Sequence, residues 1–326
     1  MAKKVVFLGT GGTIAGRAAD RSDNVGYQAA QVGVAQILDG LPALTVALEG
    51  ISPESEQVAQ IDSKDMDWPQ WKALYASAMH HLQRDDVGAL VITHGTDTLE
   101  ETAFFLSKVL PASLLASKPV VLTCAMRPST SDFPDGPQNL CDAAVVANAA
   151  GAQGVLVVCA AAVHAAIDVQ KVHTYRLDAF SSGAAGPVGF VEEGQVRWVR
   201  SLPQDWSGLQ TGLQVSADAL PRVEIVVNAV GIGGAVVRAL CTTPPAPDVQ
   251  VRGIVVAGTG NGTINRDLEA AITQAREQGI RVVITTRCAS GQLVGARGAV
   301  VSDAEYLGLS VVKARIALML ELLQTR

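Results

Sequence analysis

The chain has 326 residues, of which 48% are hydrophobic and 17% charged, and its formal net charge is −6. This length and composition are typical of a globular protein with one large domain or two ordinary domains. The acidic balance, without a block of Lys and Arg, argues against nucleic acid or an anionic membrane as a partner. The five cysteines lie apart in apolar segments without a CxxC spacing, and the five histidines show no HxxxH spacing. We therefore expect buried free thiols in a reducing compartment and no metal site.

The N-terminus predicts a strand and not an export signal. Only four strongly apolar residues, Val5 to Leu8, separate Lys3 and Lys4 from the first glycine turn, whereas a secretory signal has an apolar region of about 7–15 residues. No segment approaches the roughly 20 apolar residues that cross a membrane. We therefore expect a cytoplasmic protein without a membrane partner.

Apolar runs and helical patterns alternate along the first half of the chain. Strands are predicted at Val5–Leu8, Ala89–Thr93, Pro119–Cys124 and Gly154–Ala160. Helices are predicted between them, at Trp68–Leu82 with Asp67 as the N-cap, at about Leu99–Leu110, and at Asn139–Ala150. This alternation is typical of a parallel sheet with helices on both faces.

The second half repeats the pattern after an interruption. Short alternating runs between Ala161 and Trp198 predict hairpins and irregular structure, and a polar, Pro- and Gly-containing segment predicts a linker over 205–221. Further strands are predicted at Val223–Val227, Gly253–Ala257 and Arg281–Thr286, with helices at Arg266–Gln278 and Ser310–Leu323. The predicted fold is α/β with two domains, a larger N-terminal parallel-sheet domain over 1–204 and a smaller C-terminal α/β domain over 222–326.

A glycine-rich turn follows the first predicted strand and reads Gly9-Thr10-Gly11-Gly12-Thr13. Such a turn could hold a dinucleotide pyrophosphate, or it could bind no ligand. The dinucleotide alternative is weak because no acidic residue clearly ends a second strand about 20 residues later, and the lack of a following Gly-Lys-Ser/Thr excludes a P-loop. Glycine lets the backbone approach a substrate closely, and backbone N–H groups can stabilise an oxyanion. With a threonine on each side of the Gly-Gly pair, the turn indicates a hydrolytic site built on threonine.

A second threonine-bearing turn follows the strand at Ala89–Thr93 and runs from His94 to Thr98. Ligands of open α/β sheets bind beyond the carboxyl ends of the strands, where both turns are expected. Asp97 in this turn could serve the site or simply cap the next helix. A threonine nucleophile also needs a group that removes its proton. Lys171 is a candidate for that group, and a solvated surface lysine is the alternative.

Several motifs, in order along the chain, carry a resemblance to a known family. They are Thr10–Gly16, Asp62–Met66, Ile92–Ala103, Ala125–Ser131, Asp135–Pro137, Asp168–Lys171 and Gly258–Gly262. With these segments the chain resembles the bacterial L-asparaginases and glutaminase-asparaginases almost from end to end. The resemblance implies hydrolysis of L-asparagine to L-aspartate and ammonia through a threonine acyl-enzyme. It also implies that no cofactor is needed and that the protein is a homotetramer built from tight dimers.

The resemblance implies roles for the residues around the first turn. Thr13 corresponds to the nucleophile, and Gly12 lies beside it at the substrate. Tyr27 corresponds to a catalytic tyrosine on a mobile lid, expected over Gly16–Tyr27. Thr10, by its position in the family, belongs to the end of the strand.

The resemblance also implies roles for a second group of residues. Thr96, Asp97 and Lys171 correspond to a second catalytic cluster, in which Thr96 orients water or the nucleophile and Lys171 tunes proton transfer. Ser63 and Asp97 correspond to the pair that holds the α-carboxylate and the α-ammonium of the substrate.

Two features depart from the family pattern. Lys64 stands where family members commonly have Gln or Glu near the α-ammonium, and no glutamate in 291–301 clearly matches the one that those members contribute from a neighbouring subunit. With fewer groups to hold the α-ammonium, glutamine is expected to be hydrolysed more weakly than asparagine. Glutaminase-asparaginase activity, or a related amidotransferase-type hydrolysis, remains the nearest alternative. A non-catalytic nucleotide-binding α/β module is the alternative from another class.

Overall fold

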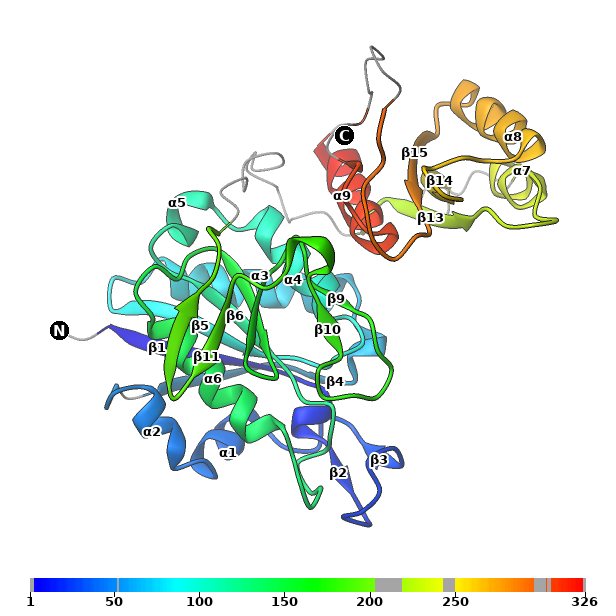
Figure 1. The fold of residues 1–326 in the computed structure, drawn as a ribbon. Helices are drawn as coiled ribbons and strands as arrows, with labels where there is room; N and C mark the ends of the chain where they lie inside the picture. The colour runs from blue at the N-terminus through cyan, green and yellow to red at the C-terminus, as the bar shows by residue number, and fades with distance from the viewer. Residues whose placement is uncertain are drawn as a thin grey trace. The chain divides into compact units, whose positions relative to one another are not determined.

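The computed structural model describes residues 3–51, 53–202, 219–242, 250–295, 303 and 306–324. The chain divides into two compact units, Met1–Gln210 and Thr211–Arg326 (Figure 1). Each unit contains a sheet with helices, so the predicted α/β class with a larger N-terminal part is confirmed. The predicted linker at 205–221 lies outside the described residues as far as residue 218.

An eight-stranded sheet forms the centre of the N-terminal unit, in the order β12-β11-β8-β7-β6-β5-β1-β4. Its strands are β1 (Lys4–Gly11), β4 (Pro53–Ile61), β5 (Val87–Thr93), β6 (Val120–Thr123), β7 (Val155–Cys159), β8 (Ala162–Ala165), β11 (Gly189–Glu192) and β12 (Gln195–Trp198). The five strands from β4 to β7 in this order are parallel, and β8, β11 and β12 continue the sheet as antiparallel strands. Two short ladders lie outside it, β2 (Arg17–Ala18) with β3 (Tyr27–Gln28) and β9 (Gln170–Lys171) with β10 (Phe180–Ser181). The predicted parallel strands and the predicted hairpins within 161–198 are therefore confirmed.

Helices cover both faces of this sheet (Figure 1). One face carries α1 (Val34–Asp39), α2 (Ala43–Ala47) and α6 (Gly136–Asn148), and the other carries α3 (Trp68–Leu82) and α4 (Leu99–Val109), with the short α5 (Ala112–Leu115) leading into β6. Alternate strand residues such as Val5, Phe7 and Val91 join the core beneath α6, because successive side chains of a strand point to opposite faces. Burial on both faces explains why these strands read as continuous apolar runs.

Helix boundaries follow local capping chemistry. Helix α3 begins and ends as predicted, and the Asp67 carboxylate accepts a hydrogen bond from the Trp68 N–H at 2.8 Å. Helix α6 begins at Gly136 and not at the predicted Asn139, with Pro137 in its first turn. Proline fits there because the first N–H groups of a helix have no partner within the helix.

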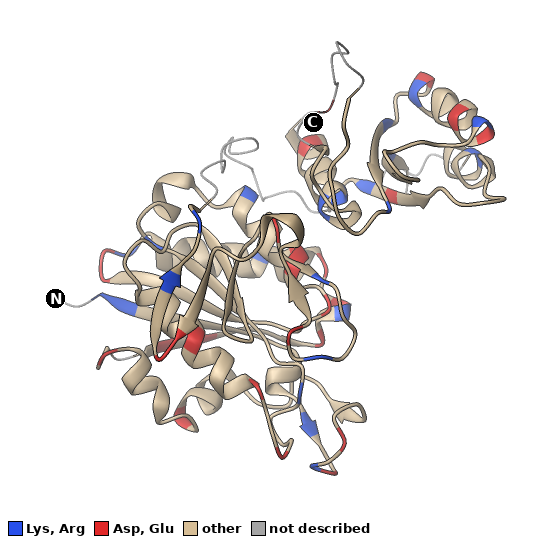
Figure 2. Cartoon of the chain, in the orientation of Figure 1, with Lys and Arg blue, Asp and Glu red and all other residues tan. Residues whose placement is uncertain are grey.

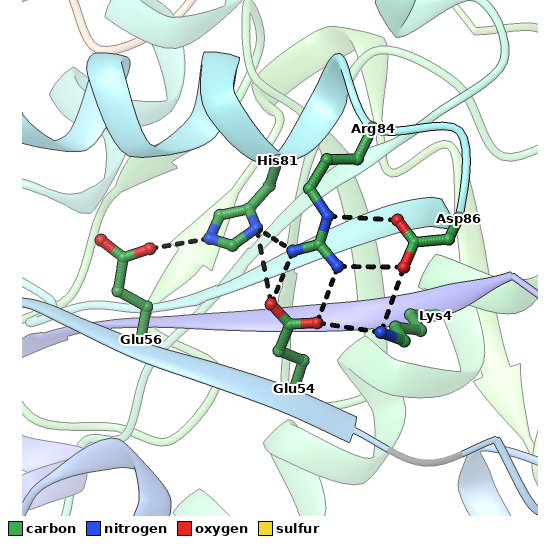
Figure 3. Close-up of polar contacts among 6 residues, drawn as sticks. All are labelled: Lys4, Glu54, Glu56, His81, Arg84 and Asp86. Atoms are coloured by element: carbon green, nitrogen blue, oxygen red, sulfur yellow. Dashed lines mark hydrogen bonds and ion pairs between the residues drawn. The ribbon is translucent and has the colours of Figure 1, made fainter.

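Strand β4 is not predicted from the sequence, because most of its residues are polar and, at the edge of the sheet, five of the nine are exposed and none is fully buried. Those polar residues anchor the strand in a network with α3 and β1 (Figure 3). Arg84 pairs with Glu54 at 2.6 Å and with Asp86 at 3.0 Å, and the His81 ring lies 2.7 Å from Glu56. Hydrogen bonding to the Arg84 guanidinium lowers the pKa of Glu54 to about 2. The polar residues Glu54 and Glu56, which obscure the strand pattern in the sequence, therefore hold β4 in place.

The C-terminal unit is a smaller parallel sheet in the order β13-β14-β15. Its elements are β13 (Arg222–Val227), α7 (Ala235–Cys241), β14 (Val251–Gly258), α8 (Arg266–Glu277), β15 (Arg281–Thr286) and α9 (Val311–Gln324). Leu268 and Ile272 of α8 pack with Val226 and Ile254 in its core. The predicted strands and the two predicted helices of this unit are confirmed, and α7 is an addition.

Lys and Arg, and Asp and Glu, are scattered over the ribbon of each unit (Figure 2). No helix in the described part of the chain is long and apolar enough to cross a membrane. All cysteines are free, as predicted, but only Cys124 and Cys159 are buried. The prediction of buried thiols is wrong for Cys288, which is exposed in the loop after β15, and holds only in part for Cys141 and Cys241.

Candidate active site

Three loops meet at the carboxyl edge of the N-terminal sheet. Strand β1 pairs in parallel with both β4 and β5, so the loops that follow these strands are neighbours. Gly12 has a φ of 79°, and a Cβ placed on it would lie 2.4 Å from the backbone N and Cα of Gly95. A Cβ on Gly95 would lie 2.4 Å from Ser63 Oγ. Glycine at both positions therefore allows the loops to touch backbone to backbone.

Thr13 lies in the first of these loops, at the start of a short 3-10 helix (Thr13–Ala15). It is 6% exposed, and its Oγ1 lies 2.6 Å from the hydroxyl oxygen of Tyr27 on β3. Burial raises the pKa of the Tyr27 phenol, and the nearby Asp62 and Asp97 carboxylates add to this effect. The phenol is therefore neutral near pH 7 and can donate to or accept from the Thr13 hydroxyl.

The other groups of this turn are occupied by the fold. The Thr10 hydroxyl is buried and donates to the Thr93 carbonyl at 2.9 Å, which ties β1 to β5. The Gly12 N–H donates to the Ile61 carbonyl at 2.9 Å. Gly12 therefore contributes close approach and not a free N–H donor, and Thr10 is engaged away from Thr13.

A second cluster gathers around Lys171, which comes from β9. Its Nζ lies 2.9 Å from Thr96 Oγ1 and 2.6 Å from Asp97 Oδ1, and its side chain is 18% exposed. Lys171 is thus not a solvated surface lysine. Asp97 does not cap α4, because the N-cap residue of this helix is Thr98. The Thr98 side chain makes no capping hydrogen bond. The Lys171 N–H donates to Glu100 Oε1 at 3.3 Å, which fixes the strand that carries the amine.

Ser63 joins the second turn to the loop after β4. It is 2% exposed, and its Oγ accepts a hydrogen bond from the Asp97 N–H at 3.2 Å. The Thr98 hydroxyl donates to the Ser63 carbonyl at 2.7 Å. The neighbouring Lys64 is 60% exposed and pairs with the Asp65 carboxylate, which raises the pKa of the Lys64 ammonium.

A buried histidine, to which the sequence alone gives no role, supports this turn. His94 is 0% exposed, and burial lowers its pKa to about 4. The neutral ring donates from Nδ1 to the Gly95 carbonyl at 2.8 Å and accepts at Nε2 from the Thr102 hydroxyl at 2.9 Å. Trp71 Nε1 donates to the same hydroxyl at 3.0 Å. The signal in the sequence is the position of His94, between a buried strand and the glycine of the turn.

The predicted site residues thus form two groups, and the contact between the Gly12 and Gly95 backbones brings the groups together. Thr13 pairs with Tyr27, while Ser63, Thr96, Asp97 and Lys171 form one hydrogen-bonded network. Thr13 follows β1, and Tyr27 lies on β3. Ser63 follows β4, Thr96 and Asp97 follow β5, and Lys171 lies on β9. The backbones of Gly12 and Gly95 are in close contact between the turns after β1 and β5. Hydroxyl groups, an ammonium and a part-exposed carboxylate at one edge of a sheet suit a polar, zwitterionic substrate.

Both parts of the chain match known proteins, which are asparaginases and glutaminase-asparaginases. Residues 4–204 match the family model for the asparaginase N-terminal domain, and residues 222–326 match that for the glutaminase/asparaginase C-terminal domain. The chain is 36% identical to L-asparaginase 2 of Escherichia coli K12, over 99% of this chain and 89% of that protein. It is 34% identical to the glutaminase-asparaginase of Pseudomonas fluorescens biotype A, over 99% and 87%. A crystal structure described as a probable cytoplasmic L-asparaginase from Campylobacter jejuni superposes with a TM-score of 0.85 at 31% identity, covering 98% of this chain and 95% of the other. The chain belongs to the asparaginase family.

Proposed function

We propose that this chain is an L-asparagine amidohydrolase, which converts L-asparagine and water to L-aspartate and ammonia. The observation that carries the proposal is the pair of hydroxyls on Thr13 and Tyr27, 2.6 Å apart, on the loop in backbone contact with the turn that bears Thr96 and Asp97. A nucleophile beside a second polar group, next to a cluster that can handle protons, is the arrangement that acyl transfer requires.

The proposed reaction has two halves. Thr13 Oγ1 attacks the carbon of the side-chain amide, and its proton passes by way of Tyr27 to the leaving nitrogen. The carbon–nitrogen bond breaks, ammonia leaves, and an ester joins the aspartyl group to Thr13. Water held near Thr96 and Lys171 then attacks the ester carbon, which releases L-aspartate and returns a proton to Thr13 Oγ1.

The same geometry supports roles in substrate binding. The Asp97 side chain is 54% exposed, so its carboxylate is accessible to the α-ammonium of a substrate. Ser63 Oγ accepts from the Asp97 N–H, which leaves its own proton to donate to the α-carboxylate. Gly12 supports binding by letting the loop approach the substrate closely.

Glutamine is the second candidate substrate, because one relative at 34% identity is named glutaminase-asparaginase. Lys64 pairs with Asp65 at the surface, so any effect of Lys64 on the α-ammonium acts from outside the Thr96–Lys171 cluster. An extra methylene alone changes specificity by about 1–3 kcal/mol. We expect kcat/KM for glutamine to be more than about tenfold below that for asparagine, a gap of about 1.4 kcal/mol.

The test measures ammonia release from asparagine and glutamine by the wild-type protein and two matched variants. Thr13→Val and Thr10→Val each remove one hydroxyl with little change in shape. Thr13→Val should lower kcat by about a thousandfold or more, while Thr10→Val should keep kcat within about tenfold and lose about 1 kcal/mol of stability with its hydrogen bond. Equal loss in both variants, with native circular dichroism, would assign the nucleophile elsewhere.

We also propose a cytoplasmic homotetramer of tight dimers, with residues 205–221 as the linker between the domains. The family resemblance supports the assembly, the two family models end at 204 and begin at 222, and the relative from Campylobacter jejuni is described as cytoplasmic. Light scattering should give four times the chain mass of 33.9 kDa. A monomeric mass with full activity would contradict the assembly, and recovery of activity in the periplasmic fraction would contradict the location.

A further inference from the structure

Two adjoining cavities lie beside helix α6, and none of the candidate active-site residues lines them. Their volumes are about 650 and 720 Å³, and both are lined by Gln138, Asp142, Glu193 and Gly194. The first reaches the turns between β7 and β8 and between β11 and β12, and the second continues between α2, α6 and β12. Each volume falls in the range of about 300–1,000 Å³ that is typical of small-molecule sites. We call the two cavities together the α6 groove.

The lining of the α6 groove has one sign of charge. It includes the carboxylates of Glu49, Asp135, Asp142 and Glu193, and no Lys, Arg or His. Between α2, α6 and β12 the lining includes seven Ala and Val residues among sixteen and the large ring of Trp198, beside polar side chains such as Asn148 and Gln195. Such a lining favours a ligand with a positive group and an apolar body, and it disfavours anions.

Asp142 provides the point of attachment in this groove. It is 3% exposed, its Oδ1 accepts from Gln138 Nε2 at 2.8 Å, and its Oδ2 has no hydrogen-bond partner. Burial raises the pKa of the Asp142 carboxyl. An oxygen that lines a cavity and accepts from no protein donor can accept from a donor that enters the groove. Gln138 is exposed, so its amide can move aside and leave both oxygens to an incoming donor.

Two tight turns build the wall opposite α6. Ala160 and Ala161 have φ values of 50° and 62° in the β7–β8 hairpin, and Glu193 has a φ of 49° in the β11–β12 hairpin. Each non-glycine residue in this region costs about 1–3 kcal/mol, and such strain concentrates at binding sites. These strained turns border the same cavity as the unpartnered oxygen of Asp142.

The chemistry of the groove selects an organic cation. Among the residues that the structure describes, no group of three or more His, Cys, Asp or Glu side chains could hold a metal ion. We propose that the α6 groove is a second binding site, in which a small organic cation places a primary ammonium on Asp142 and its apolar body against α2, α6 and β12. This site is separate from the asparagine site and does not depend on its activity.

The experiment titrates the full-length protein by calorimetry with n-hexylammonium, and with n-hexanol and hexanoate as neutral and anionic analogues of the same length. Hexylammonium should bind at least about tenfold more tightly than either analogue. Asp142→Asn keeps an acceptor for Gln138 and removes the charge, so it should fold, keep asparagine hydrolysis and lose at least about tenfold in hexylammonium affinity. Asp85→Asn removes an exposed carboxylate in the α3–β5 connection and should bind as the wild type does.

Three results would overturn the proposal. One is affinity for hexylammonium that Asp142→Asn leaves unchanged, and another is hexanol binding as tightly as hexylammonium. The third is no saturable binding below about 10 mM. An Asp97→Asn variant locates the cation, since loss of binding in that variant alone would place hexylammonium in the asparagine site.

Discussion

Mild acid should destabilise the N-terminal unit through His94. The ring is neutral in the folded protein because it is fully buried and because its Nε2 accepts a hydrogen bond from Thr102. Burial lowers the folded-state pKa to about 4, from 6.5 for a free imidazole. Between these two values the unfolded chain binds a proton at His94 and the folded chain does not. Stability from this group is therefore fully present above about pH 6.5 and is lost as the pH falls to about 4.

The size of the effect follows from the shift in pKa. Each pKa unit corresponds to about 1.4 kcal/mol, so a fall from about pH 7.5 to about pH 4 should remove about 3 kcal/mol of unfolding free energy. A typical domain has about 5–15 kcal/mol in total, so this loss is large. Glu54, with its folded pKa lowered to about 2, contributes stability that is lost only below about pH 4.5. The two groups therefore act in different pH windows.

His94→Gln isolates the contribution of the imidazole. A glutamine amide can donate to the Gly95 carbonyl and accept from Thr102, and it does not titrate. Urea unfolding followed by circular dichroism at several pH values gives the free energy of each protein. The wild type should lose about 3 kcal/mol relative to the variant between about pH 7.5 and pH 4, and His80→Gln, which removes an exposed ring on α3, is the control. A constant difference between wild type and His94→Gln over this range would refute the reasoning.

Three further outcomes are expected. Lys171→Met should lower kcat by orders of magnitude with a smaller change in KM, whereas Asp97→Asn should also raise KM because the α-ammonium loses its counter-charge. Steady-state kinetics measure kcat and KM of both variants. A normal kcat for Lys171→Met would mean that the lysine has only a structural role. Replacing Ala160 and Ala161 by Asn and Gly, which suit positive φ, should raise the unfolding free energy by about 1–2 kcal/mol in urea, and no gain would mean that the turn is unstrained. Cys288 is the exposed thiol, so it should react first with an aromatic disulfide reagent. Cys288→Ser should therefore remove the fastest phase of thiol modification. Persistence of that phase in the variant would contradict the assigned exposure of Cys288.

Apolar patterning predicts the buried strands well and the edge of the sheet badly. Strands β5 and β7 are buried on both faces and are visible as apolar runs. Strand β4 is held by the ion pairs of Glu54 and by pairing with β1. Neither interaction can be recognised in the residues of β4 alone. The short helices α1 and α2 escape for a related reason, since a helix of one or two turns has too few residues to show a period.

The sequence alone predicts the site residues that lie close together in the chain, but not contacts between distant segments. The turns with Thr13 and Thr96 stand at the ends of apolar strands, so their placement follows from the pattern. Lys171 lies 75 residues from Thr96, and only the family resemblance connects them in advance. The proposed lid is a hairpin in which Tyr27 lies on β3, tied to the 129–132 segment by a 2.7 Å bond from Ser129 Oγ to the Gly16 carbonyl. Its closure is a prediction, and the part of 291–301 where a partner glutamate is expected lies outside the described residues from 296.

The contact between Gly12 and Gly95 explains why the site depends on backbone as much as on side chains. The turn before Thr13 passes in close contact with the neighbouring turn, and any Cβ at position 12 would meet the Gly95 backbone at 2.4 Å. His94 fixes that neighbouring turn, because its Nδ1 donates to the Gly95 carbonyl. Ser63 also fixes this turn, because its Oγ accepts from the Asp97 N–H. The position of Thr96 and Asp97 is therefore set by three strands at once, so a substitution at either glycine should disturb both groups of site residues together.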